Sequence, residues 1–387
     1  MVESAVSPQP TLQTINTPSL ILNADRMDRN INRLKSHLAA LGVQLRPHLK
    51  TGKSVEVARC LMTSNAGPAT VSTLKEAEQF AAADVRDILY AVGIAPQKLD
   101  RVVALRASGV DLTVILDTVE QARLVGDASR KSGTRIPALI EIDCDGHRSG
   151  VLPDESARLI EIGNALSHYG AELRGVLTHA GGSYSARGSK ALEQCAEEER
   201  AAVVLAASTL RAAGLPCPVV SVGSTPTAHF SRNLTGVTEV RAGVFVFFDL
   251  VMAGLDVCQV DDIALSVLTT VIGHQPRKGW VLVDAGWMAM SRDRGTAKQR
   301  VDQGYGLVCD VHGSPCGDLI MVDANQEHGV VAVRAGSTAG LPDLPIGTRL
   351  RILPNHACAT GAQHATYHVV RDGSQFIEAE WPRFRGW

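Results

Sequence analysis

Between residues 17 and 248, short apolar runs alternate with amphipathic stretches, and this alternation limits the fold more than any other feature of the sequence. The runs are mostly apolar throughout, as expected for parallel strands buried on both faces. Eight or nine such units fit a closed (β/α)8 barrel better than an open doubly wound sheet, and no glycine fingerprint follows the first strand. The predicted strands are Leu20–Leu22, Val43–Arg46, Thr70–Ser72, Ile88–Val92, Leu112–Leu116, Ala138–Asp143, Gly175–His179, Val219–Val222 and Val237–Arg241. The predicted helices between them include Ser54–Thr63, Lys75–Ala83, Thr118–Ser132 and Ala191–Ala213.

After about Val260 the pattern changes to apolar runs of four to eight residues separated by Gly, Pro and Asp, with little helical period. This pattern predicts a β-rich domain. We therefore expect a barrel over residues 17–258 and a β domain over residues 259–387, which also includes the N-terminal segment 1–16.

Composition excludes several classes of partner. The 387 residues are 45% hydrophobic with a net charge of −2, which gives no electrostatic reason to bind nucleic acid or an anionic membrane. Met1–Pro10 lacks a basic region followed by an apolar stretch, and the segment Phe245–Leu255 is interrupted by Asp249, so we predict neither a secretory signal nor a membrane span. The eight cysteines are scattered without a CxxC pair, which favours free thiols in a reducing, cytoplasmic setting.

Lys50 is the first candidate for chemistry. It lies in the segment Arg46–Lys53 (RPHLKTGK) at the carboxyl end of a predicted strand, where barrel active sites are built. A lysine there can form a Schiff base if burial or nearby cations leave part of its amine neutral. The alternative is that Lys50 and Lys53 are ordinary surface charges.

Three more strand ends carry polar or glycine-containing segments. Glu141–Gly150 (EIDCDGHRSG) includes Arg148, which can donate to a phenolate or carboxylate oxygen; a solvated turn of mixed charge is the alternative. Val222–Thr227 (VGSTPT) and Arg241–Val244 (RAGV) fall where barrels commonly bind phosphate through backbone N–H groups and a hydroxyl. Glycine and serine also mark ordinary turns, so this motif is not specific by itself.

A candidate metal site lies in the β domain, in Pro354–Thr360 (PNHACAT). On an extended segment, residues i and i+2 point the same way, so His356 and Cys358 can bind one ion. Two protein ligands leave positions open for water or substrate, as in a catalytic site. His328 lies in the same domain and is either a further group near the ion or substrate, or a core histidine.

Taken together in this order, the segments resemble one family. The matches run from about Thr17 to Gly361, which is most of the chain. They are TPSLIL, RPHLKTGKS, STLKEAE, EIDCDGHRSG, LTHAGGSY, SVGSTPT, VRAGVFVFFD, DAGWMAMS, ANQEHG and PNHACATGA. The chain resembles the D-threonine aldolase and D-serine dehydratase family of fold-type III pyridoxal 5′-phosphate (PLP) enzymes, which share the alanine racemase barrel.

The resemblance implies PLP and a divalent metal as cofactors. It implies that Lys50 holds PLP, that Arg148 approaches the phenolic oxygen, and that His179 lies against the pyridine ring. The other implied cofactor-binding residues are Ser72, Tyr184 near the ring nitrogen, Gly223, Ser224 and Thr225, and Gly243 and Val244 at the phosphate, whereas His356 and Cys358 are the implied metal ligands. It also implies a homodimer with active sites at the subunit interface. One departure is Gly52, which stands where a histidine is expected after the Lys-Thr pair.

The metal pair suggests the reaction. Within the family, aldolases tend to carry His-x-Asp and dehydratases His-x-Cys, so the cysteine favours a dehydratase, most similar to D-threo-3-hydroxyaspartate dehydratases and then to D-serine dehydratases. We expect such a carbon–oxygen lyase to form oxaloacetate and ammonia from D-threo-3-hydroxyaspartate, or pyruvate and ammonia from D-serine. The alternative is aldol cleavage of D-threonine or 3-hydroxy-D-aspartate to glycine and an aldehyde. The His/Cys pair favours Zn²⁺, with Mn²⁺, Co²⁺ and Mg²⁺ as alternatives.

Two other functions share the barrel: a non-catalytic PLP carrier and an amino-acid racemase. Such carriers consist of a single barrel, so the β domain argues against the first. A racemase needs a second base facing the lysine, usually a tyrosine of the β domain, and here the metal pair is expected in that role. A second carboxylate on the substrate would need a cation, for which Arg148, His328, Arg292 and Arg294 are candidates.

Overall fold

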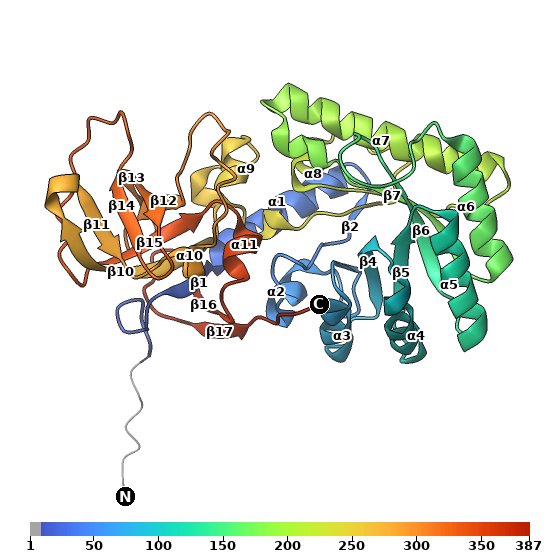
Figure 1. Cartoon of the computed structure of the whole chain (residues 1–387), viewed down its shortest axis with the longest axis horizontal. Helices are drawn as coiled ribbons and strands as arrows, with labels where there is room; N and C mark the ends of the chain where they lie inside the picture. Colours follow the sequence, from blue (N-terminus) through green and yellow to red (C-terminus); the bar gives the residue numbers. More distant parts are fainter. Residues whose placement is uncertain (1–8) are drawn as a thin grey trace, which may run out of the picture. The chain divides into compact units, whose positions relative to one another are not determined.

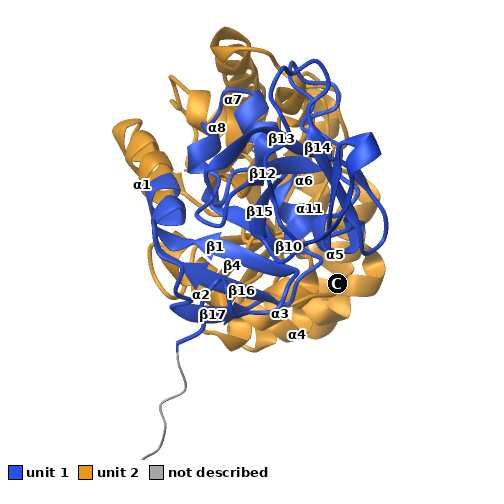
Figure 2. Cartoon of the chain, turned by 90° about the vertical axis from the view of Figure 1, so that its left-hand side faces the viewer, with its two compact units in different colours: residues 1–30, 246–383 blue, residues 31–245, 384–387 orange. Residues whose placement is uncertain are grey.

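The computed structural model describes residues 9–387 and separates into two compact units (Figures 1 and 2). The barrel unit comprises Ile31–Phe245 and Phe384–Trp387, and the β unit comprises the chain up to Asn30 together with Val246–Arg383. Residues 1–8 lie outside the described residues, and with them most of the segment for which the sequence predicts no secretory signal.

The barrel unit contains eight parallel strands in the order β2-β9-β8-β7-β6-β5-β4-β3. A parallel bridge between His48, just beyond β2, and Thr70 of β3 joins the two ends of this order, so the predicted (β/α)8 barrel is confirmed. The strands are β2 (Gln44–Leu45), β3 (Ala69–Val71), β4 (Asp87–Gly93), β5 (Asp111–Leu116), β6 (Pro137–Ile142), β7 (Glu172–Thr178), β8 (Val219–Val222) and β9 (Glu239–Val240). The helices are α1 (Ala24–Ala40), which begins in the β unit, α2 (Val55–Leu61), α3 (Leu74–Ala82), α4 (Leu99–Ala107), α5 (Val119–Ser132), α6 (Ser156–Tyr169), α7 (Ser189–Ala212) and α8 (Thr225–Phe230).

Local sequence explains where these elements begin and pack. Thr73 and Thr118 cap α3 and α5, because each side chain accepts a hydrogen bond from the backbone N–H three residues on. All six residues of β6 are buried, as expected for a strand covered on both faces. Leu89, Ile115, Leu139 and Leu177, from four successive strands, form one hydrophobic cluster. The barrel interior is thus a packed core rather than a pore.

The β unit is built on a nine-stranded sheet in the order β11-β14-β13-β12-β15-β10-β1-β16-β17. A further pairing between β10 and β11 closes six of these strands into a ring. The strands are β1 (Ser19–Asn23), β10 (Leu265–Gln275), β11 (Trp280–Val283), β12 (Gly306–Cys309), β13 (Pro315–Ala324), β14 (Gly329–Val333), β15 (Arg349–Pro354), β16 (Thr366–Val370) and β17 (Ala379–Pro382). Its helices are α9 (Leu250–Gly254), α10 (Trp287–Met290) and α11 (Ala357–Gly361). The predicted β-rich second domain is therefore present.

One predicted barrel strand lies elsewhere. The run Leu20–Leu22 forms β1, which pairs with β10 and β16 of the β unit, and its Ile21 packs against Leu12 and Leu268. An apolar run looks the same in either sheet, so the sequence alone could not assign it. By contacts the chain divides after Asn30 and after Phe245, whereas the sequence suggested limits of 17–258 and 259–387.

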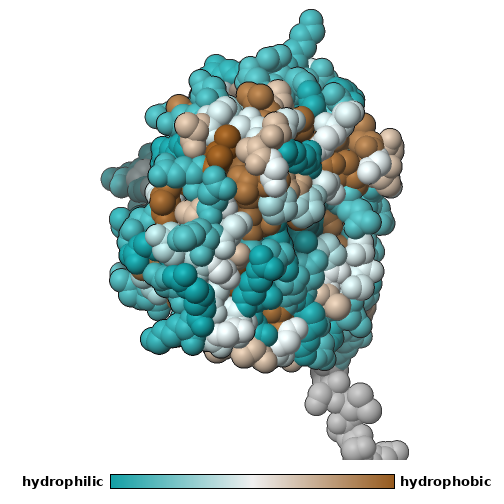
Figure 3. All heavy atoms as spheres, turned by 90° about the vertical axis from the view of Figure 1, so that its right-hand side faces the viewer, coloured by the Kyte–Doolittle hydropathy of each residue, from teal (hydrophilic) through white to brown (hydrophobic). Residues whose placement is uncertain are grey.

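The cysteines of the structure are free thiols, as the sequence predicts. All eight lie within the described residues. Within residues 9–387, no helix has both the length and the apolar character that a bilayer crossing requires. Figure 3 shows one face of the molecule, on which hydrophilic side chains predominate and hydrophobic ones are interspersed.

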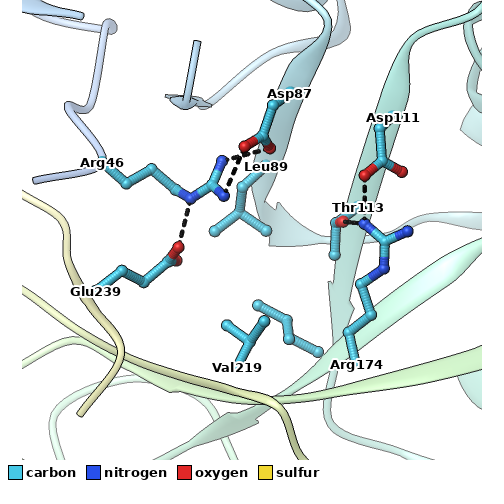
Figure 4. A pocket seen from close by; sticks show the side chains of 9 residues that line it. Arg46, Asp87, Leu89, Asp111, Thr113, Arg174, Val219 and Glu239 are labelled. Atoms are coloured by element: carbon cyan, nitrogen blue, oxygen red, sulfur yellow. Dashed lines mark hydrogen bonds and ion pairs between the residues drawn. The ribbon is translucent and has the colours of Figure 1, made fainter. Parts of the chain in front are cut away.

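Ion pairs join Arg46 and Arg174 to Asp87, Asp111 and Glu239, which are the first residues of β4, β5 and β9 (Figure 4). Arg46 Nε lies 2.7 Å from Glu239 Oε2 and its Nη1 lies 2.7 Å from Asp87 Oδ1. Arg174 Nη1 lies 2.7 Å from Asp111 Oδ2. Together they line a cavity of about 110 Å³. Because these five charged groups already satisfy one another, and because barrel active sites lie at the opposite rim, we interpret this cavity as structural.

Replacing Arg46 by alanine should destabilise the barrel unit, because Glu239, 13% exposed, would lose its cationic partner. We expect the free energy of unfolding in urea to fall by about 2–4 kcal/mol. Arg123→Ala is the matched control, since Arg123 forms exposed ion pairs within α5 and its loss should leave the free energy of unfolding close to the native value. Equal losses in the two variants would contradict this interpretation.

Candidate active site

The carboxyl ends of the barrel strands carry all of the predicted cofactor-binding residues. Because parallel strands share one direction, their carboxyl ends form a single rim. Lys50 follows β2, Ser72 follows β3, Arg148 follows β6, His179 and Tyr184 follow β7, Gly223, Ser224 and Thr225 follow β8, and Gly243 and Val244 follow β9. Lys50 and Arg148 are exposed at this rim, whereas the β8 and β9 residues are buried.

Two imidazoles lie beside Lys50. Burial, followed by the charges of Lys50 and Arg241, holds the pKa of His48 well below its ordinary value. Burial also lowers the pKa of His179 to about 3, and the charges of Arg148, Lys50 and Arg241 act in the same direction. Both rings are therefore neutral near pH 7.

Hydrogen bonds orient these two rings. His179 Nδ1 lies 2.5 Å from the carbonyl oxygen of Gly223, which only accepts, so Nδ1 carries the proton. His48 Nε2 lies 3.4 Å from Ser72 Oγ, and a backbone hydrogen bond with Thr70 partly opposes the lowering of the His48 pKa. His48 was not among the residues predicted from the sequence; it forms the bridge to Thr70, and Lys50 lies in the turn that follows.

The loop after β8 is rigidly built. Ser224 caps α8 through Thr227, and the Thr227 side chain bonds back to the Ser224 N–H. Gly223 has a φ of +154°, and a Cβ there would overlap the carbonyl of Arg241. The buried Oγ1 of Thr225 has no hydrogen-bond partner within the described part of the chain. The loop therefore presents an unused hydroxyl.

The loop after β9 approaches the lysine segment closely. A Cβ at Gly243 would lie 3.0 Å from the carbonyl oxygen of His48 and 3.2 Å from Thr51 Oγ1. Arg241, fully buried, donates to Ser221 Oγ and to the Thr178 carbonyl. Together with the exposed lysine, this buried cation makes the rim suitable for an anionic ligand.

Arg148 and Tyr184 are held more loosely. Arg148 is 58% exposed and lies 3.4 Å from Glu141 Oε1. The Tyr184 ring centre is 6.4 Å from that of His179, with the two planes tilted by 42°. Their roles toward PLP stay predictions.

The candidate metal pair lies in the β unit, directly after β15. The sequence predicted an extended segment, which is correct for His356, but Cys358 already lies in the first turn of α11. The two side chains still interact, since a hydrogen bond with Cys358 contributes to the raised pKa of His356. The pair is therefore set by a strand–helix junction rather than by strand geometry.

Asp249 orients His356. Its Oδ2 lies 3.2 Å from His356 Nδ1 and accepts a hydrogen bond from the Ala357 N–H, while its Oδ1 accepts from Met252. Burial lowers the pKa of His356, but the hydrogen bonds with Asp249 and Cys358 outweigh it and raise the pKa to about 11. A carboxylate behind a histidine is the usual way to fix the ring of a metal ligand. In the sequence, Asp249 stands out only as an interruption of an apolar segment.

No third ligand accompanies the pair: within residues 9–387 no three His, Cys, Asp or Glu side chains are arranged to hold one ion. His328 is exposed in the turn between β13 and β14. Arg292 lies over the Trp287 ring, and Arg294 pairs with Asp302 at 2.8 Å. The cation for a substrate carboxylate stays a prediction.

Comparison with known proteins identifies the class. Residues 22–251 match the family model described as "Alanine racemase, N-terminal domain", and residues 264–370 match the "Putative serine dehydratase domain". The chain belongs to the alanine-racemase-like family of fold-type III PLP enzymes. It is 55% identical over 382 residues to the D-threo-3-hydroxyaspartate dehydratase of Delftia sp. (strain HT23), covering 98% of this chain and 100% of that enzyme. It is 30% identical to the D-serine dehydratase of Dictyostelium discoideum, covering 95% and 96% of the two chains.

Solved structures show the same relationship. A D-threo-3-hydroxyaspartate dehydratase variant with a histidine replaced by alanine has a TM-score of 0.95 and 54% identity, covering 98% of this chain and 97% of that one. A second variant, with alanine at a cysteine two positions further along and in the metal-free form, has a TM-score of 0.94 and 54% identity, covering 98% and 100%.

Proposed function

We propose that this protein is a PLP- and divalent-metal-dependent dehydratase of 3-hydroxy-D-amino acids. Its preferred substrate is D-threo-3-hydroxyaspartate, which yields oxaloacetate and ammonia, and D-serine would yield pyruvate and ammonia. The observation that carries the choice of reaction is the His356–Cys358 pair oriented by Asp249. The relative of 55% identity, whose solved variants change a histidine and a cysteine at the same spacing, supports it.

The rim of the barrel fits PLP. Its cations Lys50, Arg148 and Arg241 complement the phosphate and phenolic oxygen, and the unused hydroxyl of Thr225 is a donor for the phosphate. When bound, PLP accepts the electrons of the bond broken at Cα. We assign the covalent link to Lys50, the phenolic oxygen to Arg148, the ring face to His179 with Tyr184 and Ser72 nearby, and the phosphate to Ser224, Thr225, Gly243 and Val244, with Gly223 shaping the turn.

Lys50 is also the base in this proposal: its Nζ takes the α-proton of the substrate. His48 and His179 lie beside this lysine, and burial keeps both rings neutral. Loss of the β-hydroxyl then completes the elimination, and the enamine product loses ammonia in water.

His356 and Cys358 hold the metal in this proposal. Since His356 Nδ1 faces Asp249, its Nε2 is the nitrogen that would bind the ion. A divalent ion at this pair supplies a Lewis acid for the leaving hydroxide. Nitrogen and sulfur ligands favour Zn²⁺, with Mn²⁺, Co²⁺ and Mg²⁺ as alternatives. We further propose a cytoplasmic homodimer, in keeping with the free thiols and the family resemblance.

Product analysis tests the function directly. Purified protein with PLP should convert D-threo-3-hydroxyaspartate to ammonia and a 2-oxo acid, more slowly convert D-serine, and lose both activities in EDTA until a divalent ion is restored. D-threonine serves as the aldolase probe. Glycine with glyoxylate or another aldehyde as the main products would identify an aldolase and contradict the proposal.

A further inference from the structure

Glu199 is a buried carboxylate that the proposed reaction does not use. It lies in the middle of α7 and is 2% exposed. Its Oε1 accepts two backbone hydrogen bonds, from Ala180 N–H at 2.9 Å and from Gly223 N–H at 3.0 Å. Ala180 follows β7 and Gly223 follows β8, so one oxygen ties together the loops after two neighbouring strands.

Two more hydrogen bonds join the same loops. His179 Nδ1 donates to the Gly223 carbonyl, and Ser183 Oγ lies 2.9 Å from Ser224 Oγ. The β7 loop (residues 179–184) and the β8 loop (residues 223–227) thus form one hydrogen-bonded unit. Because Glu199 accepts from the Gly223 N–H, that N–H is not available to a ligand.

Neighbouring groups stabilise the charged form of Glu199 in its buried position. Burial raises its pKa, while hydrogen bonds from Thr227, Ala180 and Gly223 and the charge of Arg241 act in the opposite direction. A buried acidic group without such partners would be strongly destabilising. An apolar side chain could fill the same space, but it would leave two buried N–H groups without an acceptor.

We propose that Glu199 is a positioning residue, which fixes the spacing between His179 and the phosphate-facing loop at Ser224 and Thr225. In the proposed function, the β7 loop contacts the ring of PLP and the β8 loop contacts its phosphate. The distance between the two loops therefore decides whether one PLP molecule can make both contacts. The expected effect on PLP affinity rests on the proposed function. The effect on the two loops rests only on the two hydrogen bonds to Glu199.

The test compares Glu199→Ala and Glu199→Gln with the control Glu198→Ala, which changes the exposed neighbour on the same helix. Hydrogen exchange of peptides covering residues 177–184 and 220–224 is measured on the apoprotein, and PLP affinity is measured by absorbance titration. In the alanine variant we expect exchange at Ala180 and Gly223 to accelerate, and PLP affinity to fall, by about tenfold or more. The glutamine variant keeps an oxygen that accepts both N–H groups, so it should stay within about threefold of the native protein, as should the control.

Native exchange and native PLP affinity in Glu199→Ala would overturn the proposal, and so would equal losses in the glutamine and alanine variants. If the alanine variant does not fold, Glu199→Asp replaces it, because one methylene less withdraws the carboxylate from both N–H groups. The same acceleration is then expected, and unaltered exchange overturns the proposal. If the native chain binds no PLP, the proposed function fails, while the exchange measurement still decides the role of Glu199.

Discussion

Lys50→Ala should abolish turnover, lowering kcat by at least about 10³-fold, because the variant loses both the covalent link to PLP and the base for the α-proton. The visible absorbance of protein-bound cofactor, recorded after gel filtration, should disappear with it. Lys131→Ala, which changes an exposed lysine in the last turn of α5, should retain both.

Full turnover in Lys50→Ala would contradict the assignment. Lys53 is the nearest other lysine in sequence, but its Nζ lies 3.2 Å from the fully buried Glu76 Oε1. That ion pair holds Lys53 in a structural role, which is why we assign the cofactor to Lys50.

The variant His356→Ala should lose the metal but keep PLP bound. We expect turnover to fall by about 10²–10⁴-fold, since a Lewis acid contributes several kcal/mol to such a step. Bound metal, measured by elemental analysis, should fall with it, whereas the absorbance of bound PLP should remain. His312→Ala, at an exposed histidine of the same unit, is the matched control.

If His356→Ala kept both its metal and its turnover, the assignment of the metal site to His356 and Cys358 would be wrong. Loss of both metal and PLP absorbance would instead show that the variant had lost its fold, so circular dichroism of the apoprotein accompanies the measurement. Cys358→Ala then provides an independent change to the same pair.

The sequence predicted the barrel and its rim because both follow from local patterns. Apolar runs mark the strands, and parallel strands must place their carboxyl ends together, so Lys50, His179 and Ser224 share one rim. The pairing of β1 with β10 and β16 leaves no such local pattern, because it joins segments more than 240 residues apart.

The supporting residues were missed for the same reason. Asp249 contacts a histidine 107 residues further along the chain, and Glu199 binds backbone groups of two separate loops. A single carboxylate within an apolar segment or a helix has no spacing that reveals its partner. What the sequence does offer is the anomaly itself, an acidic residue where an apolar one is expected.

The place of β1 determines when the β unit can be completed during synthesis. Its residues Leu20, Ile21 and Leu22 are buried, yet β10 begins at Leu265 and β16 at Thr366. At roughly 5–20 residues per second, the first partner leaves the ribosome about 12–50 s after β1. β1 is thus left unpaired while the barrel sequence emerges, and an exposed apolar strand is prone to aggregate. We therefore expect the yield of folded protein to depend on chaperones that shield β1 until β10 and β16 have been synthesised.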